Sequence, residues 1–219
     1  MLQIIITGDG SNTLYVEELN EHYHSVHGAV GESDLVFIRN GFMSCLANPV
    51  RIFEVGFGTG LNAFLTAIRS DIEKRPVYYT AVEKHPLPPE ITNSLNYPAV
   101  TGYRGKDLFR LIHTADWERD TKITEYFQLT KIRCDLTLKI PHGIYDLVYF
   151  DAFGPDKQPE MWSREIFSEI SSITASGGIL VTYSVKGSVK RILRDCGFKI
   201  ILLPGPPGKR EVLRAVKNL

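Results

Sequence analysis

The sequence predicts an α/β domain built on a doubly wound, mostly parallel sheet. From Pro49 onward, short apolar runs typical of buried strands alternate with segments that have helical periodicity. A glycine-rich loop separates the first of these runs from the first helix. The last two runs are joined by a link too short for a parallel crossover, so they must pair antiparallel. The expected sheet is therefore parallel in its centre and closed by a C-terminal antiparallel hairpin.

The N-terminal residues differ in style from the rest, and we expect residues 1–48 to form a small β-rich appendage on a main domain of residues 49–219. Turn-forming residues flank short apolar segments here, which favours strands over Gln3–Thr7, Thr13–Val16 and Leu35–Ile38. The polar stretch that contains Tyr23 is expected to be helical.

In the main domain, each expected strand is an apolar run between turn signals. The strands are Arg51–Val55, Val77–Val82, Phe127–Ile132, Tyr145–Phe150, Gly178–Tyr183, Phe198–Leu203 and Glu211–Val216. Helices are expected over Leu61–Ile68 and over Val185–Cys196, which Gly197 ends. Lys106–Glu125 is expected to be an inserted helix that caps the site or covers a sheet edge.

Composition places the chain among ordinary globular proteins. It has 219 residues, 43% of them hydrophobic, with 25 basic and 25 acidic side chains. Three scattered cysteines do not make a secreted disulfide framework, and neither an export signal nor a membrane-spanning apolar run is visible, so we expect a cytoplasmic protein. Residues 186–219 are strongly basic, which is typical of a solvated surface or of a polyanion-binding patch. The candidates for phosphate contacts are Lys186, Lys190, Arg194, Lys209 and Arg210.

The glycine-rich loop is the strongest local signal, because it leaves a strand and opens a helix as a nucleotide-binding loop does. Its candidate cofactor-binding residues are Glu54, Gly56, Gly58, Gly60 and Asn62. Glu83, at the end of the next strand, can accept hydrogen bonds from ribose hydroxyls, which suits NAD and S-adenosylmethionine equally. After the third strand, Asp135 and Leu136 stand where methyltransferases of this fold place an acid and an apolar side chain around adenine. The pattern therefore favours S-adenosylmethionine.

Asp151 ends the fourth strand of the main domain, at the sheet edge that faces the ligand crevice in open α/β folds. Amino-group methyltransferases carry a catalytic residue there, and Phe153, Pro155 and Trp162 offer flat apolar surface for a base. The alternative is that Asp151 caps the helix that starts near Pro159, but it lies eight residues before it.

Three segments, Glu54–Phe64, Val82–Leu87 and Asp151–Trp162, resemble the methyltransferase domain of the bifunctional enzymes that complete 5-methylaminomethyl-2-thiouridine at the wobble position of tRNA. The resemblance covers nearly the whole chain, and it implies the Rossmann-like class I methyltransferase fold. Those enzymes carry a flavin oxidase domain after this one. Because 219 residues leave no room for it, we expect a stand-alone form of the domain.

The resemblance implies methyl transfer from S-adenosylmethionine to the amine of 5-aminomethyl-(2-thio)uridine in a tRNA anticodon stem-loop, with separate enzymes supplying the precursor. Asp151 would orient the amine or accept its proton. Tyr23 and Ser25 would approach the methionine end of the cofactor. Phe153 and Trp162 would sandwich the uracil unless they are core residues, and Lys157 would meet a phosphate or fix the loop. Lys209 and Arg210 would contact phosphates.

Two other functions stay open at this point. An aminopropyltransferase shares the fold and the aspartate at the strand end, but it has paired acids where Ala152 and Phe153 follow Asp151 here. A non-catalytic RNA-binding subunit is opposed by the intact glycines and acids. His22, His24 and His27 do not share one helix face and lack a further ligand, so no metal is expected.

Overall fold

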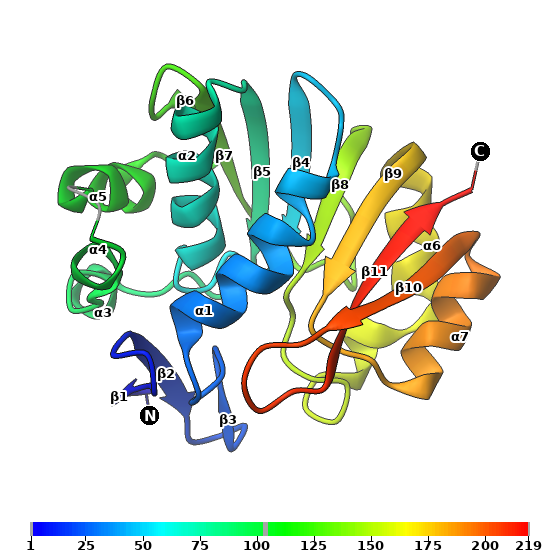
Figure 1. The fold of residues 1–219 in the computed structure, drawn as a ribbon, viewed down its shortest axis with the longest axis horizontal. Helices are drawn as coiled ribbons and strands as arrows, with labels where there is room; N and C mark the ends of the chain where they lie inside the picture. Colours follow the sequence, from blue (N-terminus) through cyan, green and yellow to red (C-terminus); the bar gives the residue numbers. More distant parts are fainter. Residues whose placement is uncertain (1, 103–104, 219) are drawn as a thin grey trace.

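A computed structural model describes residues 2–102 and 105–218 and has the expected sheet at its centre (Figure 1). Eight strands lie in the order β10-β11-β9-β8-β4-β5-β7-β6. The pairs β9–β8, β8–β4, β4–β5 and β5–β7 are parallel, whereas β11 pairs antiparallel with both β9 and β10. The strands are β4 Val50–Val55, β5 Val77–Glu83, β6 Asp120–Lys122, β7 Phe127–Arg133, β8 Tyr145–Phe150, β9 Thr174–Thr182, β10 Phe198–Pro204 and β11 Glu211–Lys217.

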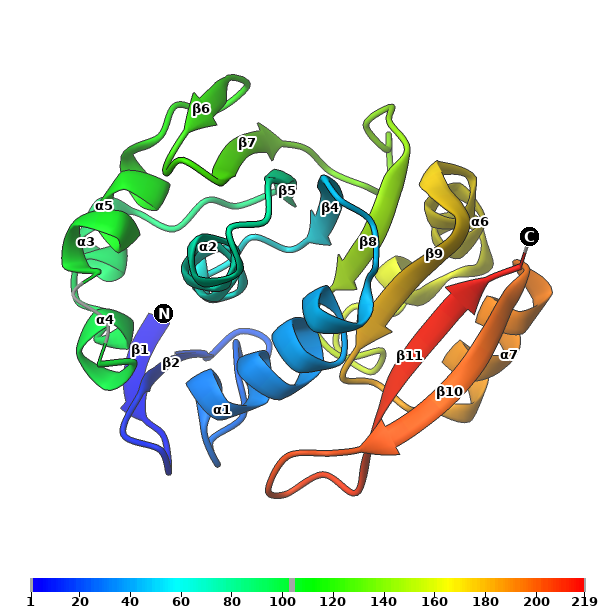
Figure 2. The same ribbon diagram turned by 45° about the horizontal axis from the view of Figure 1, so that its top comes forward.

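Helices cover both faces of this sheet (Figures 1 and 2). Helix α2 (Leu61–Glu73) and helix α5 (Lys106–Thr114) lie on one face, and α6 (Arg164–Ile173) and α7 (Gly187–Asp195) on the other. Strand β4 shows why the sheet has two cores: Ile52 packs on the α2 side, while its neighbours Phe53 and Val55 pack on the α6 side. Side chains of a strand point alternately to its two faces, so a strand buried on both sides is mostly apolar.

The N-terminal segment is only partly β. Strands β1 (Leu2–Ile6), β2 (Asn12–Val16) and β3 (Glu21–His22) form a small antiparallel sheet, as the appendage prediction requires. The predicted helix around Tyr23 is wrong, because the chain there is extended and the Tyr23 amide bonds the carbonyl of Leu14. The boundary between residues 48 and 49 stays a prediction.

The predicted strand Leu35–Ile38 is also wrong. Helix α1 (Ala29–Ser33) continues into a wider helical turn over Asp34–Arg39, followed by a short 3-10 turn over Phe42–Ser44. A run of apolar side chains is buried here because the helix lies against the sheet, where a Cβ on Gly41 would approach Tyr149 and Val181. Three successive buried residues do not distinguish a buried helix from a strand.

The N-terminus of α1 is capped by the loop between β1 and β2. The amides of Ala29, Val30 and Gly31 donate to the side chains of Thr7, Ser11 and Asp9, at 3.3, 3.3 and 2.9 Å. These amides have no partner inside the helix, so side-chain acceptors from another segment stabilise its start. The Asp9-Gly10-Ser11 motif thus fixes α1 to the small sheet.

The insertion between β5 and β7 differs from the single helix expected over Lys106–Glu125. Helix α5 ends at Thr114, and the rest of the segment returns as β6, which pairs antiparallel with β7 at the sheet edge. Two short helical turns, α3 (Pro89–Thr92) and α4 (Tyr97–Val100), precede it. Among the described residues, no helix is long and apolar enough to cross a membrane.

Candidate active site

The glycine loop after β4 passes close to the end of β8. Gly56, Gly58 and Gly60 have φ angles of +86°, +48° and +71°, which L side chains rarely adopt. A Cβ on Gly56 would lie 2.8 Å from the carbonyl oxygen of Asp151. Glycine at this position therefore brings the loop against the strand that carries the predicted catalytic acid.

Two histidines hold the loop at Thr59. Nε2 of His24 lies 2.7 Å from the Thr59 hydroxyl, and Nε2 of His113 lies 3.1 Å from the Thr59 carbonyl oxygen. Burial lowers the pKa of each imidazole to about 4, so both are neutral at pH 7. His24 thus stabilises the glycine loop through Thr59. Within the part of the chain that the structure describes, no group of three His, Cys, Asp or Glu residues is arranged to hold a metal.

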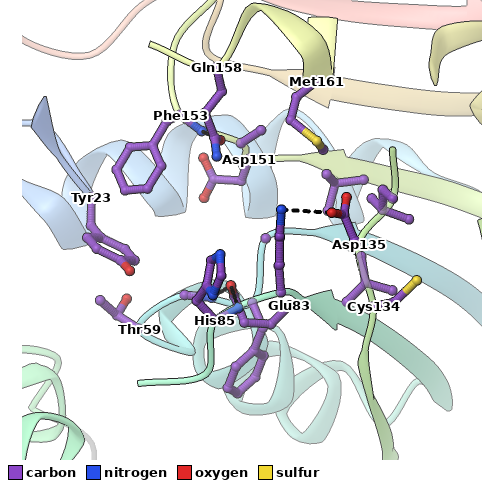
Figure 3. A pocket seen from close by; sticks show the side chains of 18 of the residues that line it. Tyr23, Thr59, Glu83, His85, Cys134, Asp135, Asp151, Phe153, Gln158 and Met161 are labelled. Atoms are coloured by element: carbon purple, nitrogen blue, oxygen red, sulfur yellow. Dashed lines mark hydrogen bonds and ion pairs between the residues drawn. The ribbon is translucent and has the colours of Figure 1, made fainter. Parts of the chain in front are cut away.

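A cleft opens between this loop and the carboxyl ends of the parallel strands (Figure 3). Glu83, at the end of β5, accepts hydrogen bonds from the amides of Gly58 (3.0 Å) and His85 (2.8 Å). Each carboxylate oxygen retains a second lone pair for a ligand. Glu83 therefore fixes the loop and still offers acceptors to the cleft.

Asp135 and Leu136 line the same cleft beyond the end of β7. Oδ2 of Asp135 pairs with Nζ of Lys84 at 2.7 Å, the contact drawn as a dashed line in Figure 3. This bond, with two further hydrogen bonds from Thr137, lowers the pKa of Asp135 to about 2. The acid is ionised at neutral pH, so it can accept a hydrogen bond from an exocyclic amine that enters beside Lys84.

Asp151 lies at the base of the cleft, directly after β8. Its Oδ2 accepts a hydrogen bond from Nδ2 of Asn62 on α2 at 2.8 Å. Burial raises its pKa to about 7; the charge of Glu32 also raises it, whereas the Asn62 hydrogen bond and the charge of Lys209 lower it. A carboxyl group with this pKa is about half ionised at pH 7 and is suited to exchange a proton there.

Glu54 does not line the cleft, although we expected it to bind the cofactor. Its side chain is fully buried under the loop, and neither carboxylate oxygen has a hydrogen-bond partner among the described residues. Burial, with the nearby charge of Asp151, raises the pKa of Glu54 well above its usual range. Glu54 therefore lies beneath the site in surroundings that favour its protonated form.

A second cavity adjoins the first at Asp151. Tyr23, His24, Asp151, Ala152 and Phe153 line both. The rings of Tyr23 and Phe153 meet edge to face with centroids 5.0 Å apart, and Figure 3 shows them on the side of Asp151 away from Asp135. The other residues that line the second cavity are Glu21, His22, Ser25, Val26, Glu32, Gly154, Tyr183 and Lys209. Asp151 thus lies where two ligands, one in each cavity, would meet.

The predicted substrate residues are divided by this geometry. Phe153 and Lys209 reach the second cavity, as does Ser25, which we expected at the cofactor, but Pro155, Lys157 and Arg210 line neither cavity. Trp162 is 4% exposed, and its Nε1 donates to the Phe153 carbonyl oxygen at 2.7 Å. Stacking of Trp162 on a base does not fit this position, because the indole is packed in the core and holds the loop.

Three residues that the sequence analysis missed belong to the site. Glu32 pairs with Lys209, Oε1 of Gln158 accepts the amide hydrogen bond of Phe153 at 3.2 Å, and the Tyr183 hydroxyl donates to the Ala152 carbonyl at 2.8 Å. Gln158 lies inside the resembling motif and was within reach of sequence reasoning. Nothing near Glu32 or Tyr183 in the sequence indicates a site.

The fold and the site define an α/β enzyme of the class I methyltransferase type. The defining features are the strand order of the sheet, the glycine loop, and the acids at or just after the ends of β5, β7 and β8. A sequence model of the family described as S-adenosyl-L-methionine-dependent methyltransferase matches residues 108–218, about half of the chain. The chain belongs to this family, and its cofactor is S-adenosylmethionine.

Relatives with known names cover almost the whole chain. The tRNA 5-methylaminomethyl-2-thiouridine biosynthesis bifunctional protein MnmC of Cupriavidus metallidurans is 31% identical over 95% of this chain and 33% of its own length. The protein of that name from Campylobacter hominis is 29% identical over 94% of this chain and 31% of its own. The chain therefore spans about a third of these curated relatives. The crystal structure of MnmC2 from Aquifex aeolicus superposes with a TM-score of 0.78 at 28% identity, covering 98% of this chain and 70% of that one.

The residues present fit the cofactor. Loop amides, the Glu83 carboxylate, and the ionised Asp135 beside apolar Leu136 match the polar and apolar parts of an adenosine. When bound, S-adenosylmethionine supplies an electrophilic methyl group on a sulfonium. The roles of the individual residues stay predictions, and the test of each is binding of the cofactor by variants.

Proposed function

We propose that the chain transfers a methyl group from S-adenosylmethionine to the primary amine of 5-aminomethyl-(2-thio)uridine at the wobble position of tRNA. Similarity to MnmC proteins over about 95% of the chain supports the substrate. The single structural observation that carries the proposal is the position of Asp151, which lines both the cofactor cleft and the second cavity. The matched family and relatives favour neither an aminopropyltransferase nor a non-catalytic subunit.

The chemistry requires an amine without its extra proton. An alkylammonium with a pKa near ~10 has no free lone pair at pH 7, so a proton must leave before nitrogen attacks carbon. In the transfer, a C–N bond forms and the C–S bond breaks; the positive charge of the sulfonium passes to the methylated amine. In its ionised form Asp151 binds the incoming ammonium and is positioned to accept its proton. Because a carboxylate by itself stabilises the ammonium, loss of the proton also requires dehydration of the pocket or a path to water. Alignment of nitrogen with the methyl carbon supplies much of the remaining rate.

The partner in this proposal is a tRNA anticodon stem-loop, which places the protein in the cytoplasm, and separate enzymes supply the aminomethyl group. Arg194 and Arg210 are exposed and Lys190 is partly exposed, so they are available to phosphates. Lys186 is paired with Asp156, and Lys209 with Glu32. Two of the five candidates for phosphate contacts are therefore engaged in ion pairs within the protein.

Radiolabelled methyl donor tests the proposal directly. The purified protein is incubated with tRNA that carries 5-aminomethyl-2-thiouridine, with tRNA that lacks the aminomethyl group, and with putrescine plus decarboxylated donor. The proposal predicts label only in the first tRNA, in a nucleoside whose mass is that of the methylaminomethyl product. Label in the second tRNA, or an aminopropylated diamine, would contradict it.

A further inference from the structure

Lys209 is held on the wall of the second cavity, where its side chain is 33% exposed. It lies in the turn between β10 and β11, and its Nζ contacts Oε1 of Glu32 on α1. The same ammonium lies 4.3 Å from the centroid of the Tyr183 ring, a cation–π contact. Carboxylate and ring together orient the charge, so this lysine is pre-organised.

Glu32 is itself held in place. It is 7% exposed, and its second oxygen accepts a hydrogen bond from the Ser25 amide at 2.9 Å. Both oxygens of this buried acid are therefore engaged within the protein. Lys209 has three N–H donors, and among the described residues its hydrogen bond to Glu32 is the one the structure provides. Since Lys209 lines the cavity, donors remain for a ligand there.

Asp151 and Lys209 line this one cavity from different elements, one from the end of β8 and the other from the β10–β11 turn. A ligand here meets a carboxylate that binds an amine and a cation that binds an acceptor. In a 5-aminomethylpyrimidine, ring carbon C5 carries the aminomethyl group, and the substituent on the adjacent carbon C4 lies beside it.

We propose that Lys209 is a specificity-determining residue that donates a hydrogen bond to the 4-carbonyl oxygen of the substrate base, while Glu32 positions it. This inference rests on the proposed function and adds to it a reason for selecting uracil. A 4-carbonyl accepts from the ammonium, whereas the 4-amino group of cytosine would turn its own donors toward a positive charge. A site built around a fixed donor discriminates strongly against a base that lacks the acceptor.

The test compares two anticodon stem-loop RNAs that differ only in carrying 5-aminomethyluridine or 5-aminomethylcytidine. Wild type is expected to methylate the uridine RNA with a kcat/KM about 10- to 100-fold higher, the range of one charge-assisted hydrogen bond. Lys209→Met is expected to lose that factor on the uridine RNA alone, which brings the ratio near one. Lys199→Met is the matched control, because it removes an exposed lysine of β10 outside both cavities, and it should keep the wild-type ratio.

If Lys209 only contacted a phosphate, Lys209→Met would lower both rates equally and leave the ratio unchanged, which overturns the inference. A double variant, Glu32→Gln with Lys209→Met, removes both charges and so avoids an unpaired buried acid. Recovery of the wild-type ratio in it would mean that the pair is merely structural and also overturns the inference. Calorimetric affinity for S-adenosylmethionine checks that each variant is folded. Failure of wild type to methylate either RNA would instead refute the proposed function.

Discussion

Replacement of Asp151 by Asn should stabilise the protein at alkaline pH while it removes the carboxylate. The pKa of Asp151 is about 7 in the folded chain against an ordinary value of 3.8, so the folded state binds the proton more tightly than the unfolded state. Ionisation of Asp151 therefore does not lower the free energy of unfolding below pH 4, and it lowers this free energy progressively as the pH rises from 4 to 7. Above pH 7 this destabilisation is constant, at about 4 kcal/mol.

The change in unfolding free energy between two pH values, compared for wild type and Asp151→Asn, isolates the effect of Asp151 ionisation. Between pH 5 and pH 8 the ionisation of Asp151 should destabilise wild type by about 2–3 kcal/mol, and Asp151→Asn should be free of this loss. The amide oxygen of the introduced side chain can still accept the Asn62 hydrogen bond, so the fold should persist. Urea unfolding at the two pH values measures the change, which corresponds to about 5–10 °C in Tm for a chain of this size. An equal pH dependence in both proteins would refute the assignment.

Three further predictions follow from the site. The kcat/KM for methyl transfer, which reports the pKa values of the free enzyme, should fall about tenfold per pH unit below the Asp151 pKa of about 7, because the protonated acid cannot take the proton of the ammonium. A flat kcat/KM profile from pH 5 to 8 would oppose this. Gly58→Ala should weaken S-adenosylmethionine binding, because the new Cβ would lie 3.2 Å from the Tyr23 ring in the cleft wall. The control is Gly177→Ala, at a position with a positive φ and open space around it, which should lower the unfolding free energy by about 1–2 kcal/mol without affecting cofactor binding. Equal cofactor affinities of the two variants in titration calorimetry would contradict this prediction. Trp162→Phe should lower the unfolding free energy by about 1–3 kcal/mol, because the Phe153 carbonyl loses its buried donor; unchanged urea denaturation would mean that the bond is dispensable.

The central sheet could be predicted because its signals are local. Strands buried on both faces are continuous apolar runs, and the short β10–β11 link permits antiparallel pairing alone. The position of Asp151 followed in the same way, since ligands of open α/β sheets bind at the carboxyl ends of the strands. Glycines with positive φ then placed the loop beside it.

The rest depends on contacts between distant segments. The chain over Leu35–Ile38 is helical because it packs on the sheet, and its buried run has no periodicity that excludes a strand. The Glu32–Lys209 pair joins positions 177 residues apart, and neither residue has a neighbour in the sequence that indicates the other. The sequence left two roles open for Trp162, contact with a base or core packing, and its contacts with Phe150 and Phe167 make it a core residue.

In the proposed reaction, Asp151 at the junction of the two cavities acts on the amine and not on the cofactor. Single-turnover methylation of an aminomethyl-uridine stem-loop by wild type and Asp151→Asn, each with its measured affinity for S-adenosylmethionine, tests it most directly. In the variant the rate constant should fall by about 10²- to 10⁴-fold, the usual contribution of general base catalysis, while the cofactor dissociation constant changes little. This role of Asp151 would be refuted by an Asn variant that transfers methyl at the wild-type rate, or by one that loses methyl transfer and cofactor affinity to the same extent.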